Sequence, residues 1–150
     1  MSTSRYVTVS VVSGILFGIL DGVINANPIA RRLFEIYKPI AKASVNVPQG
    51  ILIDLVYGFI MAGLFLLLYK SLPGQTGLIK GLSFALLAWF FRIVMYTASQ
   101  WMMFTVPAEA LLYSLIAGLG EMLVLGFLYG LTLKPFNASP IKTTSADTLQ

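Results

Sequence analysis

Four long apolar runs separated by prolines dominate this chain of 150 residues. The runs extend from about Tyr6 to Ala26, Gln49 to Tyr69, Leu78 to Phe104 and Ala108 to Leu133. All seven prolines lie outside them, as expected for helices, because proline ends a helix. Each run has the roughly 20 apolar residues that a membrane-spanning helix needs. The sequence therefore predicts an all-α transmembrane four-helix bundle in the lipid bilayer, as a single domain over residues 1–134.

Composition excludes several classes of function. The chain has no cysteine, which excludes disulfides, thiolate metal sites and iron–sulfur clusters. It has no histidine either, the usual protein ligand of haem, copper and zinc, so we expect neither a metal nor a cofactor. The net charge of +4 is best interpreted as a topology signal, and nucleic acid is not an expected partner. Residues 135–150 form a polar tail rich in Ser and Thr, for which we expect disorder.

The connection between the first two runs carries its own helix signal. Asn27 is a good helix cap and Pro28 suits a first helical position. Apolar residues then recur at helical spacing, at Ile29, Leu33, Ile36 and Tyr37. This pattern predicts a short amphipathic helix in the membrane surface from Pro28 to Tyr37, stopped by Pro39. Such a helix either simply closes the connection or has a binding or gating role.

The second and fourth runs align without gaps, which places Asp54 over Ser114. The first and third runs share a weaker pattern, with Gly14, Phe17 and Leu20 over Gly81, Phe84 and Leu87. The alignment indicates either two parallel helical-hairpin repeats or the ordinary likeness of apolar helices. Small residues also recur every fourth position, at Ser10, Gly14, Gly18 and Gly22 and at Gly126 and Gly130. These faces are typical of close helix packing, within one bundle or between two copies.

Four ionisable residues lie inside the apolar runs: Asp21, Asp54, Arg92 and Glu121. A charge at membrane depth costs on the order of 3 kcal/mol or more, so such residues usually face the bundle interior. Arg92 and Glu121 are both near mid-membrane and should form an ion pair. Asp21 and Asp54 should lie near each other, about one turn inside the face that carries the surface helix. Helical spacing adds Asn25 beside Asp21 and Tyr96 beside Arg92, which completes the predicted polar pocket.

Three classes of function fit such a pocket. It could handle a proton, an ion or a small polar solute, which in so small a bundle favours a homo-oligomer. The charges could instead hold together an accessory subunit of a larger membrane complex. Paired aspartates and the stretch Gly118-Leu119-Gly120-Glu121 are similar to intramembrane aspartyl proteases, but the acid here is Glu and the partner motif is absent. A non-enzymatic protein with a charged pocket is our leading hypothesis, and the accessory subunit is the alternative.

Several short motifs between residues 50 and 133 resemble a known group of proteins. They are the Asp-Leu-Val-Tyr-Gly-Phe stretch from Asp54, the Gly77 to Leu82 segment, Gly120-Glu121 and the Gly126 to Gly130 segment. Together they resemble a widespread group of small bacterial four-span membrane proteins with no established activity. The resemblance implies a four-span fold in the bacterial inner membrane and implies no reaction. Five basic residues on the side of the termini, against four in the first connection, favour cytoplasmic termini.

Overall fold

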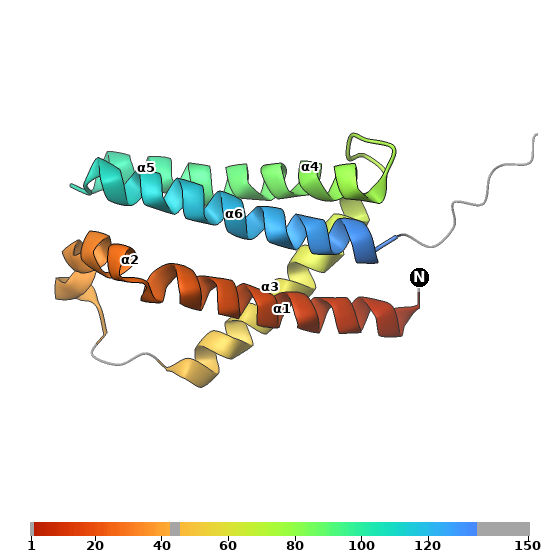
Figure 1. Ribbon diagram of the computed structural model, residues 1–150, viewed down its shortest axis with the longest axis horizontal. Coiled ribbons are helices and arrows are strands. Elements are labelled where there is room, and N and C mark those ends of the chain that lie inside the picture. Colours follow the sequence, from red (N-terminus) through yellow and green to blue (C-terminus); the bar gives the residue numbers. More distant parts are fainter. Residues whose placement is uncertain (1, 43–45, 135–150) are drawn as a thin grey trace, which may run out of the picture.

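The computed structural model describes residues 2–42 and 46–134, and the described chain is helical, without a strand (Figure 1). The elements are α1 (Thr3–Ala26), α2 (Pro28–Leu33), the 3-10 helix η1 (Phe34–Ile40), α3 (Val47–Leu68), α4 (Gly77–Trp89), the π-helix η2 (Phe90–Val94), α5 (Met95–Met103) and α6 (Ala108–Thr132). Because α4, η2 and α5 are continuous, the structure has four long helices that are apolar enough to cross a membrane. The predicted all-α four-helix bundle is confirmed. The disorder predicted for residues 135–150 concerns a segment outside the described residues.

The long helices alternate in direction along the chain (Figure 1). The most extensive contacts are those of α1 with α3 and of α4 with α6, and contacts between α1 and α6 join the two pairs. We call the end of the bundle that carries α2 and η1 the connector end, and the opposite end, where α1 begins and α6 stops, the terminal end. Helices of opposite direction therefore form two hairpins side by side.

Glycines set the closest approach within each hairpin. A Cβ atom at Gly14 of α1 would lie 2.8 Å from the backbone oxygen of Asp54, and one at Gly58 of α3 would overlap the backbone of Ser10. In the second hairpin the backbones of Gly81 and Gly126 leave no room for a Cβ on either side. The small-residue faces therefore serve packing inside this bundle at these positions, as close backbone approach in lipid requires.

The two hairpins do not share one register. The alignment of the apolar runs pairs Gly14 with Gly81, and Asp54 with Ser114. In the first hairpin Gly14 contacts the backbone of Asp54, so an exact repeat would place Gly81 against Ser114. In the structure Gly81 instead packs against Gly126, about three turns further along α6. The bundle thus contains two hairpins of the same direction, but equivalent residues of the two runs do not make equivalent contacts.

Aromatic rings close the core toward the terminal end. The ring of Phe65 on α3 lies 5.4 Å from that of Phe84 on α4 and 5.8 Å from that of Tyr129 on α6, measured between centroids. Phe65 and Tyr129 have no exposed surface. This cluster joins the two hairpins, and the corresponding part of α1 and α3 toward the connector end has no such core.

The connector differs from the prediction in one respect. Asn27 caps α2 as expected, since its Oδ1 accepts a hydrogen bond of 2.9 Å from the backbone N–H of Ala30. The helix does not remain α-helical to Tyr37, and Pro39 does not stop it. The chain tightens into a 3-10 helix at Phe34 and continues through Pro39 to Ile40. In so short a 3-10 segment Pro39 removes a single backbone hydrogen bond, which explains why the helical path survives it.

Candidate functional site

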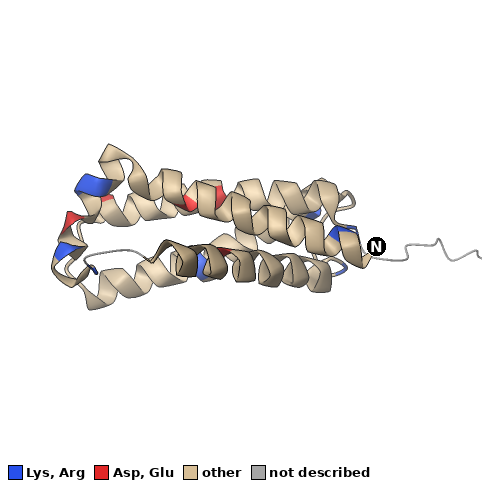
Figure 2. Ribbon diagram, turned by 90° about the horizontal axis from the view of Figure 1, so that it is seen from below, with Lys and Arg blue, Asp and Glu red and all other residues tan. Residues whose placement is uncertain are grey.

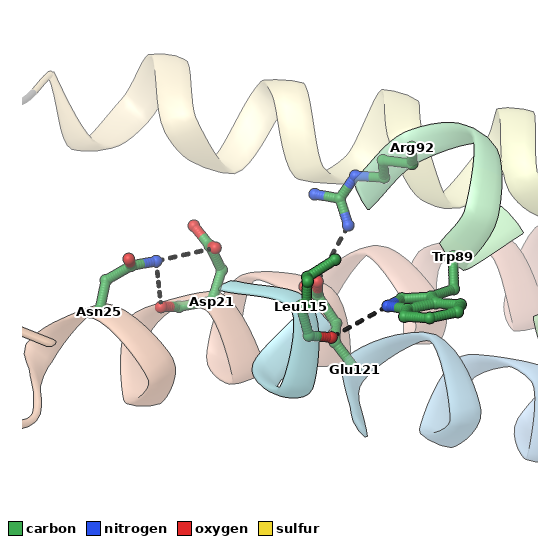
Figure 3. A network of polar contacts seen from close by, with 6 residues as sticks. All are labelled: Asp21, Asn25, Trp89, Arg92, Leu115 and Glu121. Carbon is green, nitrogen blue, oxygen red and sulfur yellow. Dashed lines mark hydrogen bonds and ion pairs between the residues drawn. The ribbon is translucent and has the colours of Figure 1, made fainter. Parts of the chain in front are cut away.

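Arg92 and Glu121 form an ion pair across the middle of the bundle. Nη1 of Arg92 donates a 2.9 Å hydrogen bond to Oε2 of Glu121 (Figure 3). The carboxylate is almost completely buried, with 4% of the side chain exposed, whereas the arginine side chain retains 32%. Both residues lie near the centre of their spans, so the predicted pair is confirmed. Each charge thereby avoids facing lipid alone.

Two aromatic rings hold the guanidinium group of Arg92. Its central carbon lies 4.5 Å from the ring centroid of Phe17 on α1 and 4.8 Å from that of Tyr57 on α3. The two rings are themselves only 4.5 Å apart. A cation above aromatic faces is attracted by the ring quadrupoles, an effect that grows when water is excluded. Arg92 therefore touches all three of the other spans and ties the two hairpins together.

A π-helical turn places Arg92 at this point. The residues from Phe90 to Val94 bond with an i→i+5 pattern inside an otherwise α-helical span. Each π turn adds one residue to the helical ladder, so residues beyond it are rotated by about 100° relative to a continuous α-helix. Next to it, Nε1 of Trp89 donates a 2.9 Å hydrogen bond to the backbone oxygen of Leu115 on α6 (Figure 3). This bond fixes the height of α4 against α6 beside the ion pair.

The prediction that Tyr96 belongs to the same pocket is wrong. Tyr96 is 63% exposed and lines a separate groove of about 320 Å³ with Tyr37 and Gln100. A spacing of four residues places Arg92 and Tyr96 on the same face only in a regular α-helix. The π turn from Phe90 to Val94 makes the helix irregular there, so the two side chains point to different faces. Trp89 was missed by the sequence analysis, although a tryptophan inside a span needs an acceptor for its N–H and so carries a usable signal.

Asp21 and Asp54 line one groove between α1 and α3. The groove has a volume of about 510 Å³ and opens toward the connector end, where the two helices diverge. Asp54 lies deeper, since a Cβ at Gly18 would come within 2.7 Å of its Oδ2, whereas one at Gly22 would meet nothing within 4 Å. The predicted proximity of the two aspartates is confirmed, and much of the remaining wall is glycine and aliphatic side chain.

Asn25 does not line the groove itself but is bonded to Asp21, which does. Its Nδ2 donates one 2.9 Å hydrogen bond to Oδ1 of Asp21 and another of 2.9 Å to the backbone oxygen of Asp21 (Figure 3). The predicted residues thus divide into three places. Asp21 and Asp54 line the groove, with Asn25 bonded to Asp21. Arg92 and Glu121 form the central pair, and Tyr96 lies elsewhere.

The charges of the site are unbalanced. Arg92 already contacts Glu121, and lysine and arginine otherwise gather mainly at the two ends of the bundle (Figure 2). Oε1 of Glu121 is buried and has no hydrogen-bond partner. Among the described residues no three Asp and Glu side chains come together in a way that could hold a metal ion. The arrangement suits a proton or a singly charged cation at the two aspartates, which present oxygen acceptors in a groove that no basic residue lines.

No family model, curated protein or solved structure matches the chain. The resemblance to small bacterial four-span membrane proteins therefore stays a prediction.

Proposed function

We propose that this is a non-enzymatic membrane protein whose α1–α3 groove binds a proton, an ion or a small polar solute. One observation carries the proposal: two carboxyl groups inside the apolar spans line a single open groove of about 510 Å³. A charge at membrane depth is costly, and in membrane proteins it usually marks a path or a binding site for ions or protons. Asp21 and Asp54 are the ligand groups in this proposal.

The sign of the charges favours a cation or a proton over an anion. The one basic residue within the described spans, away from their ends, is Arg92, and Glu121 holds it at 2.9 Å. Nothing of positive charge therefore lines the groove with the two aspartates. Because Glu121 is engaged with Arg92, the two aspartates are also the acids free to exchange a proton.

The proposal is tested with purified protein in liposomes. Asp21→Asn and Asp54→Asn keep the shape of the side chain and remove its charge. Since a hydrogen bond to a charged group contributes about 1.5–3 kcal/mol, each variant should reduce proton-coupled or cation-dependent flux by about tenfold or more. Glu109→Gln is the matched control, because Glu109 is an exposed acid at the start of α6 and not part of the groove. Equal flux in all four proteins would contradict the proposal.

A second candidate is an accessory subunit of a larger membrane complex. The observation that favours it is Arg92, whose contacts with Phe17, Tyr57 and Glu121 join the spans in the way a purely structural ion pair would. The mass of the particle after gentle detergent extraction separates the two candidates. A small homo-oligomer supports the groove as the functional element, and a large hetero-complex supports the accessory subunit.

A further inference from the structure

Positive charge is concentrated at the connector end of the bundle. It lies on the connector, which consists of α2 and η1, and on Lys42 just after it. Between Pro28 and Lys42 the chain has four basic residues and a single acid, Glu35. All four basic side chains, Arg31, Arg32, Lys38 and Lys42, are exposed. Figure 2 shows this end of the bundle with basic and acidic ribbon segments close together.

Three of the four basic side chains, Arg31, Arg32 and Lys42, form no ion pair among the described residues. Lys38 donates a hydrogen bond to Oε1 of Glu35, and this contact holds the pKa of Glu35 below its usual range. The carboxylate therefore stays charged at neutral pH and remains with Lys38. In the described part of the chain the other ion pair is that of Arg92 with Glu121, so Arg31, Arg32 and Lys42 form no ion pair there, and Arg32 acts on Glu35 only at longer range.

A surface recess lies between these side chains. It has a volume of about 450 Å³ and is lined by Arg31, Arg32, Phe34, Glu35 and Lys38. The planar guanidinium group of arginine presents paired N–H donors that match the oxygens of a phosphate group. Two such groups on neighbouring residues beside an open recess suit a phosphodiester.

Apolar side chains flank the basic ones on the same connector. Ile29, Ile36 and Ile40 are exposed by 65%, 41% and 81%. The connector joins the end of one span at Ala26 to the start of the next at Val47, so it lies at the level where hydrocarbon gives way to headgroups. Exposed isoleucines next to arginines at this level are typical of a segment that inserts its apolar side and holds its charges among headgroups.

The connector is also docked firmly on the bundle. Nδ2 of Asn27 donates a 2.6 Å hydrogen bond to the hydroxyl of Tyr113 on α6, and that hydroxyl donates a 2.7 Å hydrogen bond to the backbone oxygen of Ile24. The ring of Phe34 packs edge-on against Tyr113, with 5.9 Å between centroids. The arginines are therefore held at a fixed height relative to the spans rather than on a free loop.

We propose that the connector binds the headgroup of an anionic phospholipid. The guanidinium groups of Arg31 and Arg32 contact the phosphate, and the exposed isoleucines lie against the upper part of the acyl chains. The occupant is a bilayer lipid rather than a free phosphate, because the apolar side chains beside the recess need an apolar partner that inorganic phosphate lacks.

The test uses the full chain in nanodiscs of phosphatidylcholine, alone or mixed with phosphatidylglycerol. Native mass spectrometry measures how much of each lipid the released protein retains. Wild-type protein should retain phosphatidylglycerol in preference, and the double variant Arg31→Ala, Arg32→Ala should bind it about 30-fold more weakly, equivalent to about 2 kcal/mol for two charges at an anionic surface. The matched control is Arg5→Ala, Lys70→Ala, which removes two charges at the terminal end and should leave retention unchanged.

Three results would overturn the proposal. The first is wild-type protein that retains both lipids equally. The second is an equal loss in the control variant, which would mean that charge at any position suffices. The third is wild-type protein that binds inorganic phosphate in detergent without any lipid preference in nanodiscs. A salt titration of wild-type retention needs no variant, and the preference should weaken as salt screens the charges.

Discussion

The stripe of glycines on α1 allows a graded test of the packing. Gly14 faces the backbone of α3, Gly18 faces the side chain of Asp54, and Gly22 faces open space. Replacing each in turn by alanine adds the same methyl group to the same helix at one-turn intervals. The three variants differ only in what the methyl group meets.

Gly14→Ala should be destabilising. Its Cβ would lie 2.8 Å from the backbone oxygen of Asp54 and from Cα of Leu55, where ordinary contact begins at 3.4 Å. The helices must therefore separate, and overpacking of this kind costs about 1–3 kcal/mol. The better helix propensity of alanine returns up to about 1 kcal/mol. Because the methyl group meets backbone atoms rather than a side-chain tip, the cost should lie in the upper part of that range, about 2–3 kcal/mol, which leaves an expected net loss of about 1–2 kcal/mol in the free energy of unfolding.

Gly18→Ala and Gly22→Ala should behave differently. At Gly18 the methyl group meets Oδ2 of Asp54 at 2.7 Å, and the tip of a side chain can move where a backbone cannot. Stability should change little, while the carboxylate of Asp54 shifts within the groove. At Gly22 nothing lies within 4 Å, so alanine should be neutral or stabilising by up to about 1 kcal/mol.

The measurement is unfolding of each purified variant by sodium dodecyl sulfate in mixed micelles, followed by circular dichroism. The reasoning is refuted if Gly14→Ala is as stable as wild type, or if Gly22→Ala loses as much as Gly14→Ala. The second result would show that the open part of the stripe is covered in the membrane, most simply by a second copy of the chain.

Two further substitutions test single contacts by thermal melting in detergent. Glu121→Ala leaves the guanidinium group of Arg92 without its carboxylate and should cost about 3 kcal/mol or more. The double variant that also replaces Arg92 by Met should recover part of this loss, and equal stability of the single and double variants would argue against the pair. Asn27→Ala removes the cap on the N–H of Ala30 and the bond to Tyr113, and should cost about 1–2 kcal/mol; an unchanged midpoint would show that the connector docks by other contacts.

Run length and proline positions were enough to predict the four spans. The boundaries agree to within a few residues because proline and polar residues leave little freedom in where an apolar helix ends. The pairing of Arg92 with Glu121 and of Asp21 with Asp54 followed from depth alone, since residues at one height in a narrow bundle have few neighbours to choose from.

Other features depend on contacts that a single sequence does not encode locally. The segment Phe90 to Val94 contains no glycine or proline, so its sequence does not indicate a π turn. Because that turn rotates the residues after it, the position of Tyr96 could not be predicted. The register of each hairpin depends on which glycines meet across the two helices. Small residues that recur every fourth position allow several such registers, so the sequence does not select one. Pro39 was expected to end the connector helix because the rule applies to α-helices, and the chain is 3-10 helical there.

Because α1 and α3 diverge toward the connector end, the groove between them is wide at its mouth and narrow at its inner end. The two helices touch near Gly14 and Gly18 and separate toward Gly22 and Gly50, where an added Cβ would meet nothing within 4 Å. Asp54 lies at the narrow part against Gly18, and Asp21 lies one turn closer to the wide mouth. For the cation binding proposed above, this shape predicts that a bare proton or small ion reaches both carboxylates, whereas a bulky cation halts at Asp21. The angle at which the two helices cross would then select cations by size.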